Sequence, residues 1–145
     1  MNLNEMIDIL NEDLANEIKH LLFYSAHASS MTGPERLELQ EFFIEQAKSE
    51  LEHVQQFSNL IVGLGGIPES QPSSFNRYAS GNKAILQEAL RIEQDVVKNY
   101  ALRIEQAQSM EGLIEDKKYI EIFLEDQLKD SRSDIDNICQ ILRGM

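Results

Sequence analysis

The chain has 145 residues and 42% hydrophobic residues, which suits one globular domain over residues 1–145 with a buried core and excludes a disordered chain. Its net charge of −12 repels the phosphate backbone, which excludes nucleic acid as a partner. The single cysteine, Cys139, excludes a disulfide within the chain.

Helical spacing of apolar residues dominates the first half of the sequence. Alternating steps of three and four predict a helix over residues 3–31, with Asn2 and Glu5 as its capping pair. The same spacing predicts a second helix over residues 34–64, with Pro34 in its first position. Because few residues connect these helices, we expect them to be antiparallel neighbours.

The second half repeats this arrangement after a long linker, residues 65–82, that is loop-like throughout. Helices are expected over residues 83–110 and 116–142, with a short break around Gly112. A helix of ~30 residues is about 45 Å long, and some ~17 extended residues reach roughly 55 Å. The linker can therefore run the length of a helix. We predict an all-α four-helix bundle with a long crossover between its second and third helices.

Three of these helical patterns carry a glutamate in the middle of an otherwise apolar face: Glu17, Glu50 and Glu93. His53 follows Glu50 at Glu-x-x-His spacing, so the two share one side of the helix. Buried carboxylates are costly unless a positive charge compensates them. Carboxylate and imidazole suit iron, manganese or zinc, and helix bundles hold metal pairs with this combination. The sequence therefore predicts a metal centre.

The fourth helix differs from the complete pattern. Gln127 and Asp130 stand where a second Glu-x-x-His is expected, and a neutral amide does not bridge two cations as a carboxylate does. Asp126 and Asp134 are alternative ligands. We therefore expect an intact metal position on the side of the first helix pair and an altered one on the side of Glu93 and Asp130.

Other polar residues of the first helix have plainer interpretations. His20 and His27 flank the apolar face and are interpreted as packing or surface groups. On its spacing alone, Tyr24 is a core residue rather than a redox-active one. None of the three adds to the predicted metal centre by pattern alone.

Taken together, these motifs resemble the bacterioferritin branch of the ferritin-like superfamily, and the similarity runs over nearly the whole chain. The matching segments are Asn16-Glu17 with Tyr24 and His27, Glu50-Leu51-Glu52-His53, Leu64-Gly65-Gly66-Ile67-Pro68, and Ile92-Glu93-Gln94-Asp95 with Lys98-Asn99. The resemblance implies a ferritin-like four-helix bundle. It also implies oxidation of ferrous iron by oxygen or peroxide at a di-iron ferroxidase centre, with storage of the ferric product in a hollow 24-subunit shell.

The resemblance also implies roles for individual residues. It makes Glu17 and His53 terminal ligands of one iron, Glu50 a bridge, Glu93 a ligand of the second iron and Tyr24 a nearby redox residue. Gln127 and Asp130 occupy the places of the second bridge and the second histidine, which puts rapid two-electron oxidation in doubt. The haem-ligating methionine of the family is Leu51 here, so no haem is expected.

The favoured function is therefore iron binding, ferroxidase activity and iron storage, at a di-iron centre or with iron at one position only. The alternatives are a bundle with a degenerate centre that serves as a metal buffer or structural subunit, and a di-iron peroxidase or oxygenase. Expected partners are metal ions, oxygen or peroxide, and further copies of the chain, as dimers or a 24-subunit shell. No long apolar run or signal peptide is present, which favours the cytoplasm and no membrane.

Overall fold

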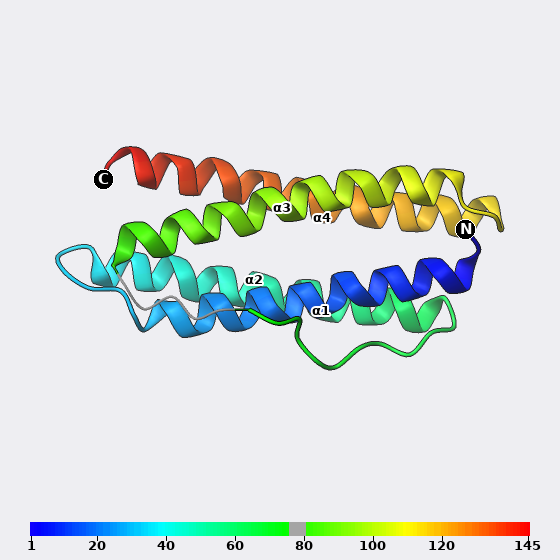
Figure 1. Ribbon diagram of the computed structural model, residues 1–145, viewed down its shortest axis with the longest axis horizontal. Helices are drawn as coiled ribbons and strands as arrows, with labels where there is room; N and C mark the ends of the chain where they lie inside the picture. The colour runs from blue at the N-terminus through cyan, green and yellow to red at the C-terminus, as the bar shows by residue number, and fades with distance from the viewer. Residues whose placement is uncertain (76–80) are drawn as a thin grey trace. The chain divides into compact units, whose positions relative to one another are not determined.

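A computed structural model describes residues 1–75 and 81–145, and in these residues it contains α-helices and no strand (Figure 1). The helices are α1 (Leu3–Ala28), α2 (Arg36–Gly63), α3 (Asn82–Ser109) and α4 (Ile114–Arg143). The four expected helices are confirmed, and the largest difference is at the end of α1, expected at residue 31 and observed at Ala28. In the described part of the chain, every helix is too short or too polar to cross a membrane.

The ends of the helices follow local chemistry. The expected cap of α1 is confirmed, because the Glu5 amide donates a hydrogen bond of 2.9 Å to Asn2 Oδ1. The prediction that Pro34 is the first residue of the second helix is wrong, because α2 begins at Arg36. The Arg36 amide donates to the Gly33 carbonyl at 3.1 Å, which makes Pro34 the second residue of a tight turn. The fixed φ of proline suits that position as well as it suits a helix start.

The described chain divides into two compact parts. Asp8–Ile85 forms one part, and Leu86–Met145 forms the other together with Met1–Ile7. We call α1 with α2 the first hairpin, and α3 with α4 the second hairpin. Within each hairpin the two helices run antiparallel, as their short connections predicted (Figure 1).

The described half of the linker lies along the first hairpin. Asn11 on α1 donates to the Ile67 carbonyl at 2.9 Å and accepts from the Glu69 amide at 2.8 Å. Farther along, the Ser73 amide donates to the Ala15 carbonyl at 3.1 Å. The chain therefore leaves the end of α2 and turns back along α1 (Figure 1).

The linker ends at the opposite end of this hairpin. Thr32 lies in the connection between α1 and α2, and its amide donates to Asn82 Oδ1 at 2.9 Å. Asn82 Nδ2 returns a bond of 2.7 Å to the Thr32 carbonyl. Because Asn82 begins α3, the expected crossover is confirmed. The part of the expected linker at residues 76–80 lies outside the described residues.

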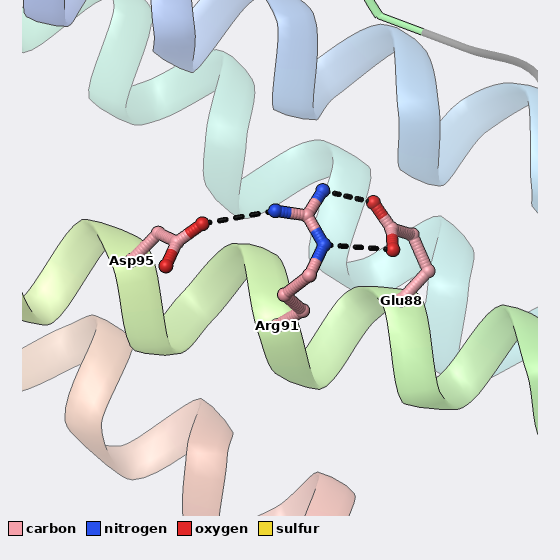
Figure 2. Close-up of polar contacts among 3 residues, drawn as sticks. All are labelled: Glu88, Arg91 and Asp95. Carbon is pink, nitrogen blue, oxygen red and sulfur yellow. Dashed lines mark hydrogen bonds and ion pairs between the residues drawn. The ribbon is translucent and has the colours of Figure 1, made fainter.

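The second hairpin separates exposed charges from a buried face. On α3, Arg91 Nε donates to Glu88 at 2.9 Å and Nη1 donates to Asp95 at 3.0 Å (Figure 2). Exposed ion pairs of this kind contribute little to stability. Glu93 lies on the same helix with 0% exposure, so its carboxylate belongs to the apolar face rather than to this surface network.

Candidate metal centre

Three polar side chains meet inside the first hairpin. Glu17 lies on α1 and Glu50 and His53 lie on α2, and their exposures are 1%, 1% and 2%. One ligand atom from each lies within 4.8 Å of the other two. His53 Nδ1 donates to Glu50 Oε2 at 3.3 Å and lies 3.5 Å from Glu17 Oε2. The antiparallel pairing of α1 and α2 thus brings Glu17 close to two residues that lie more than thirty positions farther along the chain.

Opposite charges hold this group together. Burial alone would lower the pKa of His53, but its hydrogen bonds with Glu17 and Glu50 and the charges of both carboxylates raise it to about 11. Burial alone would raise the pKa of Glu17, but hydrogen bonds with Glu50 and His53 outweigh burial, and the charges of His20 and His53 add to them. The pKa of Glu17 falls to about 2. At neutral pH the group therefore contains carboxylate and imidazolium.

This donor set fits a divalent metal. Two carboxylates and one imidazole are ligands that iron, manganese and zinc accept. A metal ion that binds here takes the place of the proton on His53, because only the neutral imidazole coordinates. Glu17, Glu50 and His53 form the one group of at least three His, Cys, Asp or Glu residues within such ligand distances in the described residues. These residues would hold the ion and supply its negative charge.

Aromatic side chains pack against one another in the core of the first hairpin. Tyr24 is fully buried, and its ring makes an edge contact with Phe43 at a centroid distance of 5.2 Å. Phe23 contacts Tyr24 at 5.4 Å and His27 at 4.4 Å. His27 Nδ1 donates to the Phe23 carbonyl at 2.8 Å, so its ring is fixed against the core. The packing interpretation of His27 agrees with this arrangement.

The second hairpin carries the remaining expected ligands. Glu93 and Gln127 are buried, with exposures of 0% and 2%. Asp130 is exposed, although it lies one turn beyond Gln127 on α4. The two buried positions retain the oxygen donors that the sequence predicted, whereas the Asp130 carboxylate is accessible from the surface of the chain.

Three buried polar groups of the first hairpin were given no ligand role from the sequence: Asp13, His20 and Gln46. His20 is 4% exposed, and its charge acts on the Glu17 carboxylate. Gln46 is 9% exposed on the face of α2 that carries Glu50. A signal for His20 was present, because Glu17 and His20 have the same Glu-x-x-His spacing as Glu50 and His53.

Comparison with known proteins identifies the family of this chain. The profile of the family described as ferritin-like domain matches residues 7–144. None of the curated proteins matches the chain in sequence. Among solved structures, a ferritin-like, diiron-carboxylate protein from Bacillus anthracis is 28% identical with a TM-score of 0.86, covering 97% of this chain and 96% of that one.

Two further solved structures share the fold at lower identity. A bacterioferritin from Desulfovibrio desulfuricans is 17% identical with a TM-score of 0.88, covering 97% of this chain and 80% of that one. A Dps protein from Bacillus brevis is 14% identical with a TM-score of 0.86, covering 97% of this chain and 96% of that one. The four helices and their crossover therefore have the fold of these proteins.

Proposed function

Since the chain belongs to the ferritin-like domain family, we propose that it binds ferrous iron, oxidises it to ferric iron and stores the product. Iron is the substrate and the cargo of this reaction. The observation that carries the proposal is the buried group of Glu17, Glu50 and His53 with its ligand atoms within 4.8 Å. Two carboxylates and an imidazole are ligands that iron accepts, so this group supports metal binding.

The chemistry of this group suits a change of iron charge. Two ferrous ions reduce one oxygen molecule to hydrogen peroxide with two protons, or reduce one hydrogen peroxide to two water molecules with two protons. Glu17 and Glu50 supply negative charge that stabilises the ferric product more than the ferrous substrate. His53 supplies a neutral nitrogen once its proton has left, and it releases that proton on binding.

The proposal includes a second, weaker metal position with Glu93, Gln127 and Asp130. The buried Glu93 carboxylate supplies one anionic ligand. Gln127 supplies a neutral amide oxygen, which binds a cation less strongly than a carboxylate and does not bridge two ions. We therefore expect ions in the first hairpin to bind more tightly than ions in the second.

A second candidate function is metal buffering without rapid oxidation. The buried side chain of Gln127 favours this function, because position 127 carries a neutral amide and not a carboxylate that could bridge two ions. Under this alternative the chain binds divalent metal reversibly and oxidises iron no faster than the ion oxidises in solution. The rate of ferric iron formation separates the two functions.

We further propose a cytoplasmic homo-oligomer in which each chain contributes one domain, residues 1–145, and in which no haem is bound. Leu51, where the resemblance requires a haem-ligating methionine, is 48% exposed, and its side chain has no atom that ligates iron. Light scattering coupled to size-exclusion chromatography distinguishes a dimer from a shell of about 24 chains, and the absorption spectrum of the purified protein tests for haem.

The test of the proposed function compares iron binding and iron oxidation in matched variants. Metal-free protein is titrated with ferrous iron without oxygen and is then exposed to oxygen or peroxide while ferric absorbance is followed. Glu17→Gln removes one buried carboxylate, and Glu52→Gln removes an exposed one from the same hairpin. We expect only Glu17→Gln to abolish tight binding and oxidation. Wild-type protein that binds no iron would refute the proposal.

A further inference from the structure

The short connection of the first hairpin, residues 29–35, joins α1 and α2 at one end only. Glu17 lies eleven residues before the end of α1 at Ala28, but only six residues after Asn11. The metal centre is therefore closer along α1 to Asn11 than to the connection. Whatever attaches α1 to α2 near Asn11 also influences where Glu17 lies relative to its partners on α2.

The start of the linker provides such an attachment. We call residues 67–73 the strap. The chain leaves α2 after Gly63, and the Asn11 side chain then binds it at two points, donating to the Ile67 carbonyl at 2.9 Å and accepting from the Glu69 amide at 2.8 Å. Because the strap continues covalently from α2, these bonds fasten the end of α2 to α1 (Figure 1).

The sequence of the strap suits this contact. Pro68 stands between the two residues that Asn11 binds, and proline restricts both itself and the preceding residue to extended conformations. In an extended chain the carbonyl before Pro68 and the amide after it point to the same side. A side-chain amide has an oxygen and an NH2 group, so Asn11 pairs with both. The contact uses no amide hydrogen of residue 68, which proline lacks.

The strap is held by hydrogen bonds more than by apolar burial. Ile67 is 86% exposed, and the side chains from Glu69 to Pro72 are exposed as well. One further bond joins the Ser73 amide to the Ala15 carbonyl at 3.1 Å. Segments with few buried contacts open locally at a small cost in free energy. The strap can therefore detach from α1 while the hairpin stays folded.

Both points of attachment lie next to the metal centre in sequence. Ala15 precedes Glu17 by two residues, and Asn11 precedes Ala15 by about one helical turn. The ligand atoms of the centre lie within 4.8 Å of one another and come from both helices. Metal sites require ligand distances that are correct to within about 0.2 Å. A small rotation or shift of α1 against α2 therefore changes how well the centre fits an ion.

We propose that Asn11 is a positioning residue for the metal centre, and that attachment of the strap and metal binding in the first hairpin favour each other. Asn11 acts through the strap and does not ligate the ion. The proposal rests on the proposed function, because it requires metal at Glu17. Coupling between two sites is reciprocal: the factor by which the attached strap raises metal affinity equals the factor by which metal raises attachment.

Hydrogen exchange of wild-type protein tests this coupling without any variant. The exchange rates of the Glu69 and Ser73 amides are measured by NMR without metal and with saturating zinc. We expect zinc to slow exchange at both amides about fivefold, at the lower end of the usual range for coupled sites. Zinc that binds without slowing exchange at either amide overturns the proposal.

Two variants break the contact from opposite sides. Asn11→Leu removes both of its bonds, and Glu69→Pro removes the amide that Asn11 accepts from while leaving α1 unchanged. Each should lower zinc affinity about fivefold, matching the exchange factor. Their combination should cost no more than either alone, because both break one contact. Asn4→Leu, the same change at an exposed position of α1, should have no effect. Full affinity in Asn11→Leu, or losses that multiply in the combination, overturns the proposal.

The visible spectrum of bound cobalt(II) separates positioning from loss of folded protein, because it depends on the number and arrangement of the ligands. Asn11→Leu should alter the shape of the cobalt bands at saturation. Bands of unchanged shape and lower amplitude would mean fewer folded chains and would overturn the proposal. If wild-type protein binds neither zinc nor cobalt, the proposed function itself fails. If wild type and both variants bind alike, only this inference is overturned.

Discussion

The two hairpins have helices of similar length and each contains a buried glutamate, but the hairpins differ in the charge around that glutamate. In the first hairpin Glu17 meets a second carboxylate, Glu50, and an imidazole, His53, within ligand distance. In the second hairpin the residue that aligns with Glu50 is Gln127, a buried amide. The difference shows that a helix can keep the same pattern of burial while its polar positions change from anionic to neutral.

Charge balance explains why the first hairpin tolerates its polar core. His53 carries a proton at neutral pH because both carboxylates stabilise the imidazolium and raise its pKa to about 11. The metal-free state is thus an ion cluster that a divalent metal can replace. With its amide, the second hairpin carries less buried negative charge and therefore less drive to bind a cation.

Matched removal of one glutamate from each hairpin should give the largest effect. We expect Glu50→Ala to lower cobalt affinity by at least about 100-fold, since loss of a ligand exceeds the 10–100-fold cost of losing a supporting residue. Glu93→Ala should cost about tenfold. Equilibrium dialysis with metal analysis measures both. A larger loss in Glu93→Ala would reverse the ranking of the two hairpins.

Restoring a carboxylate in the second hairpin should reduce the asymmetry. Gln127→Glu should strengthen metal binding by that hairpin about tenfold and accelerate iron oxidation, because an anionic ligand replaces a neutral one. Gln94→Glu adds the same charge at an exposed position of α3 and serves as the control. Equal gains in both variants would attribute the effect to net charge rather than to ligation.

The ion cluster predicts how the stability of metal-free protein depends on pH. The pKa of His53 is raised from 6.5 to about 11, so its contribution is complete below pH 6.5 and is lost as pH rises toward 11. Between these pH values the free energy of unfolding falls by at most about 1.4 kcal/mol per pH unit. The pKa of Glu17 is lowered from 4.5 to about 2, so its contribution is complete above pH 4.5 and is lost as pH falls toward 2.

Urea unfolding of metal-free protein between pH 4 and 10 measures this dependence. His53→Leu should reduce the loss of stability as pH rises above 6.5. His27→Leu, which replaces a buried histidine outside the cluster, should not change that loss. A loss that stays unchanged in His53→Leu would show that the imidazolium does not stabilise the metal-free fold.

The smallest expected effect concerns Tyr24. Tyr24→Phe keeps the edge contact with Phe43 but removes the phenolic hydroxyl that a redox role requires. We expect the number of bound metal ions to be unchanged and the rate of iron oxidation to fall by less than the roughly 100-fold that loss of a proton-transferring side chain costs. Stopped-flow absorbance of ferric iron measures the rate, and an unaltered rate would leave Tyr24 as a core residue.

Much of this architecture follows from local sequence chemistry. The spacing of apolar residues placed all four helices, and the length of the linker predicted the crossover that the Asn82 hydrogen bonds with Thr32 confirm. The start of α2 was misplaced because proline fits both a helix start and the second position of a turn. Such ambiguities are settled by backbone hydrogen bonds rather than by residue type.

The candidate site was predictable only in part. Glu17, Glu50 and His53 were recognisable because polar residues interrupt apolar faces at helical spacing. The burial of His20 was not, since a flanking position on an isolated helix is as compatible with the surface as with the core.

The sequence by itself determined the helices, the crossover and the presence of carboxylates on apolar faces, because these depend on spacing along the chain. Only the tertiary structure decided that His53 pairs with both Glu17 and Glu50, and that His20 is buried. Contact between two helices depends on their register and on the rotation of each about its axis, and packing of the whole face determines both.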